Sequence, residues 1–381
     1  MTRSKSRVLS IGFLILLLAL GGFGYRVGRA AQTAVLESQS GSISEFTLDP
    51  TAPGFRAFTE STPTVLVLHT TVTAAGAELV GVSLLTEADG DAGGTVVTIP
   101  RTFTEPDSRN IALSTLFAEE GLDSVTAEMR ASLRIGFQDV VVLDAAAWTT
   151  LMAPDLPLEL TLRDDLVTID PDGSTRVLLR AGTRPFDLAE IARMAAHRNP
   201  GEPGLAVALR QQQIWQSWIS RTASSTERPD LFQLDSGFVD LIGSLANAEV
   251  SYRVIPSVTE PSNDPEAARY IAERTPIHDL IAQIVPFPEP AEPGDRPSVL
   301  LLDTTFGETS SQPFVSAIAR SGGLVTILGN SEADSGMSAE VQVHESSASA
   351  IANEIADRLG LPTPTDVPLE DATASITVII G

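Results

Sequence analysis

The sequence contains no cysteine, and this absence excludes several chemistries at once. Without thiols the chain has no disulfide framework, no cysteine nucleophile and no cysteine-held metal site. Positive charge is also scarce: lysine occurs only at Lys5, and 25 basic residues face 49 acidic ones, which gives a formal net charge of −24. Because an acidic surface repels phosphate backbones, nucleic acid is excluded as a partner.

Other catalytic signatures are missing too. The four histidines, at 69, 197, 278 and 344, are dispersed, and none has a partner at metal-ligand spacing, so no zinc site is expected. No Gly-x-Ser-x-Gly nucleophile motif occurs. The glycine-rich stretch 90–94 lacks the lysine of a phosphate-binding loop and is expected to be a hairpin turn.

What the sequence does contain begins with an uncharged apolar run at 8–25, preceded by Arg3, Lys5 and Arg7. Its length is close to the ~20 residues that cross a bilayer. The basic flank is expected to stay in the cytoplasm, so the run predicts a single-pass anchor in the cell membrane with the rest of the chain outside. A cleaved signal peptide is the alternative, because small residues follow in the stretch GRAAQTA.

Composition divides the remainder of the 381 residues. After the cytoplasmic tail and anchor (1–30), a polar and turn-rich spacer is expected at 31–60. A segment in which proline alternates with acidic residues, 286–297, predicts a stiff linker. It separates a large domain at 61–285 from a small one at 298–381.

The small domain is expected to be a two-layer βαββαβ sandwich. Its apolar and alternating stretches predict strands at 298–303, 324–329, 339–345 and 375–381, with helices at 312–323 and 348–360. No cluster of catalytic groups accompanies them.

The large domain is also predicted to be α/β. Strands are expected at 64–72, 77–88, 94–100 and 139–144. A helix at 186–198 begins with a capping box formed by Asp187 and Glu190. A second helix is expected at 205–221, with a core face comprising Leu205, Leu209, Gln212, Trp215 or Gln216, and Ile219.

Three arginines are candidates for binding an anion, two at the ends of predicted elements and one within the second helix. Arg101 follows Pro100 at a strand end, Arg198 ends the first helix, and Arg210 opens the motif RQQQ. The guanidinium group is a planar, permanently charged fork that suits phosphate, so the three side chains are candidates for an anion clamp. The alternative is surface ion pairing with the abundant carboxylates.

The succession of an N-terminal anchor, VLVLH, TIPR, FDLAEIARMAAHR and ALRQQQIWQSWI resembles the LytR-CpsA-Psr family of bacterial envelope proteins. The small domain resembles the LytR C-terminal domain. The resemblance implies an α/β/α fold around a mixed sheet, with a hydrophobic groove for a polyprenyl chain. It also implies transfer of a phosphoglycan from polyprenyl pyrophosphate to peptidoglycan, with arginines on the pyrophosphate and aspartates on magnesium.

Carried over residue by residue, the resemblance assigns pyrophosphate binding to Arg101, Arg198, Arg210 and Gln211. His69 ends the strand that reaches the pocket in this family, and it is a pocket candidate. The other interpretation of His69 is a surface residue at a strand end.

The family pattern is broken at several positions. Thr102 stands where an aspartate follows the strand-end arginine, and Gly76 and Glu78 stand where the second strand should open with arginine and aspartate. The first arginine of an Arg-x-Arg motif is replaced by Ala196, and the aspartate and arginine of an Asp-x-x-Arg motif are replaced by Gly204 and Val207. Glu78 and Thr102 therefore remain pocket candidates, while no residue is assigned to a metal.

These departures favour a degenerate member that binds a polyprenyl-linked or anionic glycan, or that assists an active paralogue in glycopolymer attachment. Loss of the magnesium ligands would raise the barrier to phosphoryl transfer. An active phosphotransferase with magnesium is the first alternative, with Glu78, Asp89 or Asp91 as replacement ligands. The second is a non-catalytic envelope scaffold.

Overall fold

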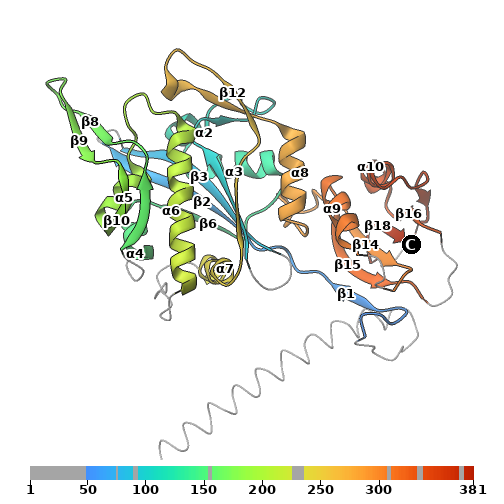
Figure 1. The fold of residues 1–381 in the computed structure, drawn as a ribbon. Coiled ribbons are helices and arrows are strands. Elements are labelled where there is room, and N and C mark those ends of the chain that lie inside the picture. Colours follow the sequence, from blue (N-terminus) through green and yellow to red (C-terminus); the bar gives the residue numbers. More distant parts are fainter. Residues whose placement is uncertain are drawn as a thin grey trace, which may run out of the picture.

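The computed structural model describes residues 49–73, 76–88, 93–152, 157–224, 236–306, 310–332, 338–368 and 373–381. The apolar run 8–25 and the glycine-rich stretch up to residue 92 lie outside these ranges. Among the described helices, none combines the length and apolarity that crossing a bilayer needs. The described chain folds into a large and a small α/β domain, which lie side by side in Figure 1.

The large domain is organised around a five-stranded mixed sheet with the order β11-β4-β3-β2-β6. β2 pairs antiparallel with β3 and parallel with β6, and β4 pairs antiparallel with β3 and parallel with β11. Apolar β-branched runs explain why the middle strands are buried on both faces. The bounds are β2 Thr64–Thr73, β3 Gly76–Glu87, β4 Gly94–Pro100, β6 Asp139–Leu143 and β11 Val250–Val254.

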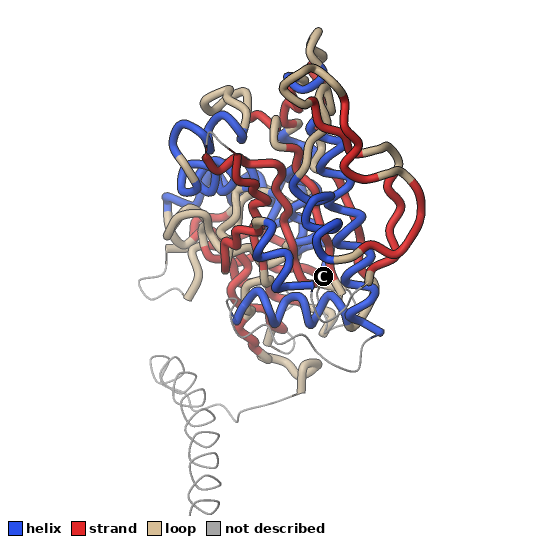
Figure 2. Tube along the Cα trace, turned by 90° about the vertical axis from the view of Figure 1, so that its left-hand side faces the viewer, coloured by secondary structure: helices blue, strands red, loops and turns tan. Residues whose placement is uncertain are grey.

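Helices cover both faces of this sheet, so the domain has three layers (Figures 1 and 2). Alternate strand residues such as Val65 and Leu66 enter separate cores on opposite faces. The predicted α/β/α arrangement around a mixed sheet is therefore confirmed. One face carries α4 Ala145–Met152, α5 Leu188–Ala196, α6 Gly204–Ser224 and α7 Ser236–Ala246, and the other carries α2 Leu113–Glu120, α3 Leu122–Leu133 and α8 Arg274–Ile284.

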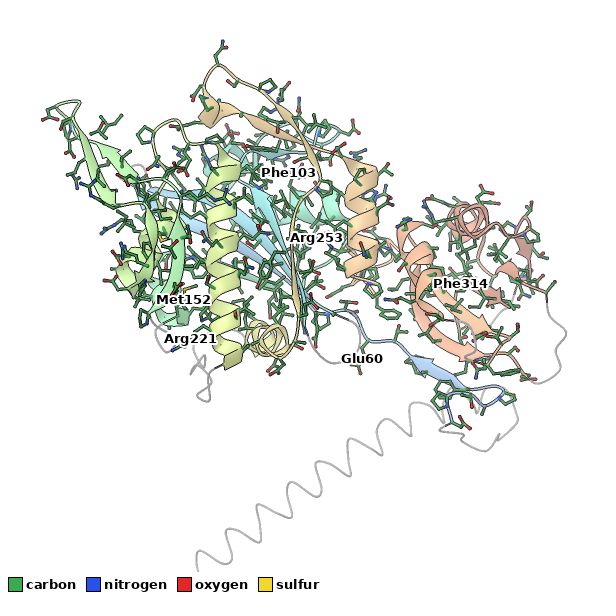
Figure 3. All side chains as sticks on the ribbon, viewed as in Figure 1. Glu60, Phe103, Met152, Arg221, Arg253 and Phe314 are labelled. Atoms are coloured by element: carbon green, nitrogen blue, oxygen red, sulfur yellow. The ribbon has the colours of Figure 1, made fainter. Side chains whose placement is uncertain are left out.

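Three small sheets extend the large domain. A three-stranded one has the order β12-β13-β5, and its fully buried Phe103 lies beneath the segment that carries β12 (Figure 3). The other two are antiparallel pairs, β7 with β10 and β8 with β9. The bounds are β5 Phe103–Thr104, β7 Leu158–Leu162, β8 Leu166–Ile169, β9 Thr175–Leu179, β10 Gly182–Phe186, β12 Ser257–Glu260 and β13 Arg269–Ala272.

The small domain has one sheet with the order β1-β15-β14-β18-β16-β17. Its two helices contribute to a single core with the sheet, and Phe314 of α9 packs against that core (Figure 3). β1 lies in the range predicted as a spacer, yet it pairs antiparallel with β15 and belongs to this sheet. The bounds are β1 Arg56–Phe58, β14 Ser298–Asp303, α9 Gln312–Arg320, β15 Leu324–Asn330, β16 Glu340–Val343, α10 Ser349–Leu359, β17 Thr365–Asp366 and β18 Ile376–Ile380.

The segment predicted as a linker joins the domains by direct contacts. The Arg296 guanidinium donates to the backbone oxygens of Arg134, at the end of α3, and of Ala319 and Gly323, at the end of α9. Arg320 of α9 also pairs with Asp279 of α8 at 3.0 Å. Carbonyl groups at helix ends lack partners within the helix. Arg296 therefore donates hydrogen bonds to backbone carbonyl groups of both domains.

Helix α6 forms as predicted, but the expected core face is only partly right. Trp215 and Ile219 are buried as expected, whereas Leu209 is exposed and the other buried residues include Val207, Ala208, Gln211, Ile214 and Trp218. Gln211 packs over Gly81 of β3, where an added Cβ atom would lie 2.2 Å from Gln211 Oε1. The missing side chain at Gly81 thus lets this face of α6 approach the sheet, and the large apolar area of the two tryptophans favours its burial.

Candidate anion-binding cleft

Arg101 emerges at the end of a central strand. β4 ends at Pro100, which pairs with Gly81, and Arg101 and Thr102 form the turn that follows. Proline supplies no amide for a ladder hydrogen bond, so a strand that reaches it commonly ends there. The turn is held because the amide of Ser114 donates to the Arg101 oxygen at 2.9 Å.

Arg101, Arg198 and Glu78 line one cleft of about 310 Å³, which we call the arginine cleft. Its walls are the ends of β2 and α5 and the beginning of β3. The capping box predicted for α5 is present, with Asp187 accepting from the amide of Glu190, and the helix ends at Ala196. Two of the three candidate arginines are therefore brought together. The remaining lining residues are Thr71, Val72, Thr73, Leu79, Val80, Ala196 and His197.

The charges of the arginine cleft are unevenly satisfied. Arg101 Nε is buried and has no hydrogen-bond partner among the described residues. Arg198 Nη2 lies 3.3 Å from Glu266 Oε2, and Glu78 accepts a hydrogen bond of 2.9 Å from the hydroxyl of Thr73. A buried guanidinium donor without a partner costs free energy, and the described residues leave this donor of Arg101 unmatched.

A second cleft, of about 570 Å³, adjoins the first through Arg101, which lines both. We call it the outer cleft. Glu266 belongs to it, so the Arg198–Glu266 pair connects the two clefts. Its lining comprises Arg101, Thr102, Asn110, Ile111, Ala112, Ser114, Thr115, Asp264, Glu266, Ala267 and Arg269.

Thr102 is committed to the fold. It is buried, its hydroxyl donates to the Ala268 oxygen at 2.7 Å, and its own backbone oxygen accepts from the amide of Tyr270. The threonine therefore ties the end of β4 to the chain that leads into β13. A hydroxyl engaged in this way is no substitute for a metal-binding carboxylate.

Arg210 and Gln211 do not reach the arginine cleft. Arg210 pairs with Glu202 at 2.5 Å and also donates to the backbone oxygens of Met194 and His197. Gln211 is fully buried and donates to the Ala195 oxygen at 2.8 Å. Both side chains thus bind the last turn of α5 to α6, and they hold the loop that carries Arg198.

His69 is a buried core residue, so the surface interpretation of it is wrong. Its ring stacks on Trp148 with centroids 5.5 Å apart and meets Trp215 at 6.1 Å, and its Nε2 atom lies 2.9 Å from the hydroxyl oxygen of Ser83. Burial lowers the pKa of His69 to about 3. The aromatic cluster lies on the same side of the sheet as α5 and α6, and His69 is not among the residues that line the arginine cleft.

Magnesium, implied by the resemblance for active members, does not fit the described residues of this cleft. Glu78 is the one carboxylate among the lining residues, and two guanidinium groups share the cleft with it. Elsewhere in the described ranges, no three acidic or histidine side chains gather in a group that could hold a metal ion. Asp89 and Asp91 lie outside the described residues.

The solved structures that resemble this chain include LytR-CPS2A-Psr family proteins. The structure of B. subtilis TagT is similar with 16% identity and a TM-score of 0.45, over 64% of this chain and 93% of that one. TagV of B. subtilis gives 12% and 0.44, over 58% and 96%. One structure of TagT, also called YwtF, is titled as carrying bound octaprenyl pyrophosphate lipid and gives 16% and 0.43, over 64% and 92%.

No protein-family model matches the sequence, and no curated protein matches it. With identities below 20% and TM-scores below 0.5, a function has to be argued from the residues of this chain.

Sequence reasoning missed Glu266. The stretch DPEA at 264–267 signals a capped turn, because Asp264 can accept from the amide of Glu266 and proline suits a first helical position. The structure shows this bond at 3.0 Å. Nothing local, however, connects residue 266 with residue 198.

Proposed function

We propose that the large domain binds an anionic, phosphate-bearing glycan of the bacterial envelope in the arginine cleft, without catalysing its transfer. The single observation that carries the proposal is the convergence of Arg101 and Arg198 on one cleft, with Arg101 Nε buried and unpartnered among the described residues. Guanidinium groups bind phosphate oxygens through charge-assisted hydrogen bonds.

The chemistry of the cleft favours binding over catalysis. Phosphoryl transfer is assisted by metal ions that neutralise developing charge, and the described lining offers one carboxylate only. Holding an anion requires donors alone. In this proposal the protein acts in cell-wall glycopolymer attachment by retaining a carrier-linked or polymeric glycan, or by presenting it to an active paralogue.

The proposal includes an extracytoplasmic location. The apolar run 8–25 with its basic flank would anchor the chain in the cell membrane and leave both α/β domains outside. A substrate carried on polyprenyl pyrophosphate would then meet the arginine cleft at the membrane surface.

The test uses the full chain purified in mild detergent. Geranyl pyrophosphate and inorganic pyrophosphate are titrated with magnesium or with a chelator, and heat of binding and phosphate release are followed together. Binding that is independent of magnesium and without release supports the proposal. Phosphate release would instead support the alternative of an active phosphotransferase. If neither probe binds, the remaining alternative is a non-catalytic envelope scaffold.

Comparison of the two probes separates the anionic group from the lipid. Equal affinity assigns recognition to the phosphates, and a large gain for the geranyl compound assigns part of it to an apolar surface. Arg180→Ala is the matched control, because Arg180 is an exposed arginine outside the residues that line either cleft.

A further inference from the structure

The Glu266 carboxylate contacts a guanidinium group and a backbone amide, which are two donors that commonly bind anions in proteins. One carboxylate oxygen lies 3.3 Å from Arg198 Nη2, and the other accepts a 2.5 Å hydrogen bond from the amide of Gly201. Gly201 has a φ of +73°, a conformation that suits glycine and that directs this amide from the loop between α5 and α6. A guanidinium and a backbone amide around one carboxylate form an anion site that the chain's own side chain fills.

We infer that Glu266 occupies the place of a ligand anion at Arg198, and that it sets the charge selectivity of the arginine cleft. A ligand must displace this carboxylate before Arg198 can bind it. An anion with two or more charges competes well, because it can bind Arg101 and Arg198 together, whereas a single charge gains little by replacing another. The inference rests on the proposed function and names Glu266 as its specificity-determining residue.

The Arg198–Glu266 pair is weak enough to be displaced. The two side chains retain 29% and 27% of their exposure, and partly exposed ion pairs contribute little to stability. By contrast, the Arg210–Glu202 pair keeps only 9% and 11%, and its arginine also donates to two backbone oxygens. The more exposed pair is therefore the one at the arginine cleft, whereas Arg210 and Glu202 line a separate cleft of about 400 Å³.

The turn that carries Glu266 is held independently of Arg198. The 3-10 turn Pro265–Ala267 is capped by Asp264, and Thr102 donates to the Ala268 oxygen directly after it. The Glu266 carboxylate can thus leave Arg198 while the backbone keeps its position. Because Arg198 lines the arginine cleft and Glu266 the outer cleft, this movement breaks the ion pair that connects the two clefts.

The experiment compares the full-length wild type with Glu266→Gln. The amide keeps the size of the side chain and an oxygen for the Gly201 amide, and it removes the charge. Pyrophosphate and dimethyl phosphate, which carries a single charge, are titrated separately, with thermal unfolding as a check on the fold. Glu354→Gln is the matched control, because Glu354 pairs with Arg358 at 3.1 Å on α10 of the small domain and neither residue lines either cleft.

We expect Glu266→Gln to bind dimethyl phosphate about fivefold more tightly, the factor that corresponds to loss of one partly exposed ion pair, and pyrophosphate more tightly by a smaller factor. Discrimination against the singly charged anion should therefore fall, and Glu354→Gln should match the wild type. Unchanged or weaker binding by Glu266→Gln, while the wild type binds, overturns the inference but leaves the proposed function intact. Binding that survives Arg101→Ala and Arg198→Ala defeats the proposed function, and absence of binding in both wild type and Glu266→Gln defeats both.

Discussion

The loop between α5 and α6 contributes one residue to each of two arginine–glutamate ion pairs. One pair stabilises the fold, and the other lies at the proposed binding site. Arg210 and Glu202 are buried, and they bind the end of α5 to α6. Arg198 and Glu266 are partly exposed, and they lie between the two clefts. Arg101 makes no ion pair in the described residues. Arg210 is therefore committed to the fold by its buried ion pair. Arg198 and Arg101 are the two arginines proposed to bind a ligand.

The largest expected effect breaks the buried pair. Arg210→Ala removes one partner of a buried ion pair and leaves Glu202 without its main donor, which costs about 3–5 kcal/mol of unfolding free energy. Urea unfolding followed by circular dichroism measures this loss. Arg180→Ala is the control and should shift the same free energy by about 0.5 kcal/mol or less. A small effect of Arg210→Ala would return this residue to the list of ligand-binding candidates.

The next effect concerns His69, in the aromatic cluster that packs against α6. The pKa of His69 is about 3 in the folded protein, below its unfolded value of about 6.5. Below pH 6.5 the unfolded chain binds a proton that the folded chain excludes, so stability falls with pH by about 1.4 kcal/mol per unit.

Between pH 6.5 and 5 the wild type should therefore lose about 2 kcal/mol more than His69→Gln, which retains a polar partner for Ser83. Denaturant unfolding at both pH values measures the difference. Parallel losses in the two proteins would show that His69 is accessible to protons in the folded state.

A third prediction tests the arginine without an acidic partner. Arg101→Ala should weaken pyrophosphate binding by about 2 kcal/mol, roughly thirtyfold in Kd, because hydrogen bonds to a charged group are lost. Its unfolding free energy should change little, because no ion pair is broken. Calorimetric titration and urea unfolding of the same samples measure both quantities, and a stability loss without a binding loss would make Arg101 a structural residue.

The smallest effect is expected at Arg198. Arg198→Ala should weaken pyrophosphate binding only about fivefold. In the wild type, part of the binding free energy gained at Arg198 is offset by breaking its ion pair with Glu266. The same calorimetric titration measures it. A loss larger than that of Arg101→Ala would mean that Glu266 does not compete with the ligand.

Local signals explain what was predictable. The capping box at Asp187 and Glu190, the strand end at Pro100 and the alternating strands depend on neighbours in sequence, and the structure contains all of them. The core face of α6 was predicted correctly at Trp215 and Ile219 but wrongly at Leu209, because Gln211 packs on a glycine of β3 more than a hundred residues away. Helical periodicity alone could not choose between the Leu209 face and the Gln211 face.

The site was predictable only in part for a similar reason. Arg101, Arg198 and Glu78 meet because three elements end at the same edge of the fold. Arg210 looks equivalent to them in sequence, and only its burial beside Glu202 separates it. Glu266 reaches Arg198 through the β12–β13 hairpin, so no spacing rule in the sequence indicates this contact.

The most direct test of the central claim is a crystal structure of the protein grown with pyrophosphate and without a divalent cation. The account predicts an anion in the arginine cleft that contacts Arg101 and Arg198, with the Glu266 carboxylate displaced from Arg198. An anion bound elsewhere, or an arginine cleft that stays empty with Glu266 still paired to Arg198, would contradict it.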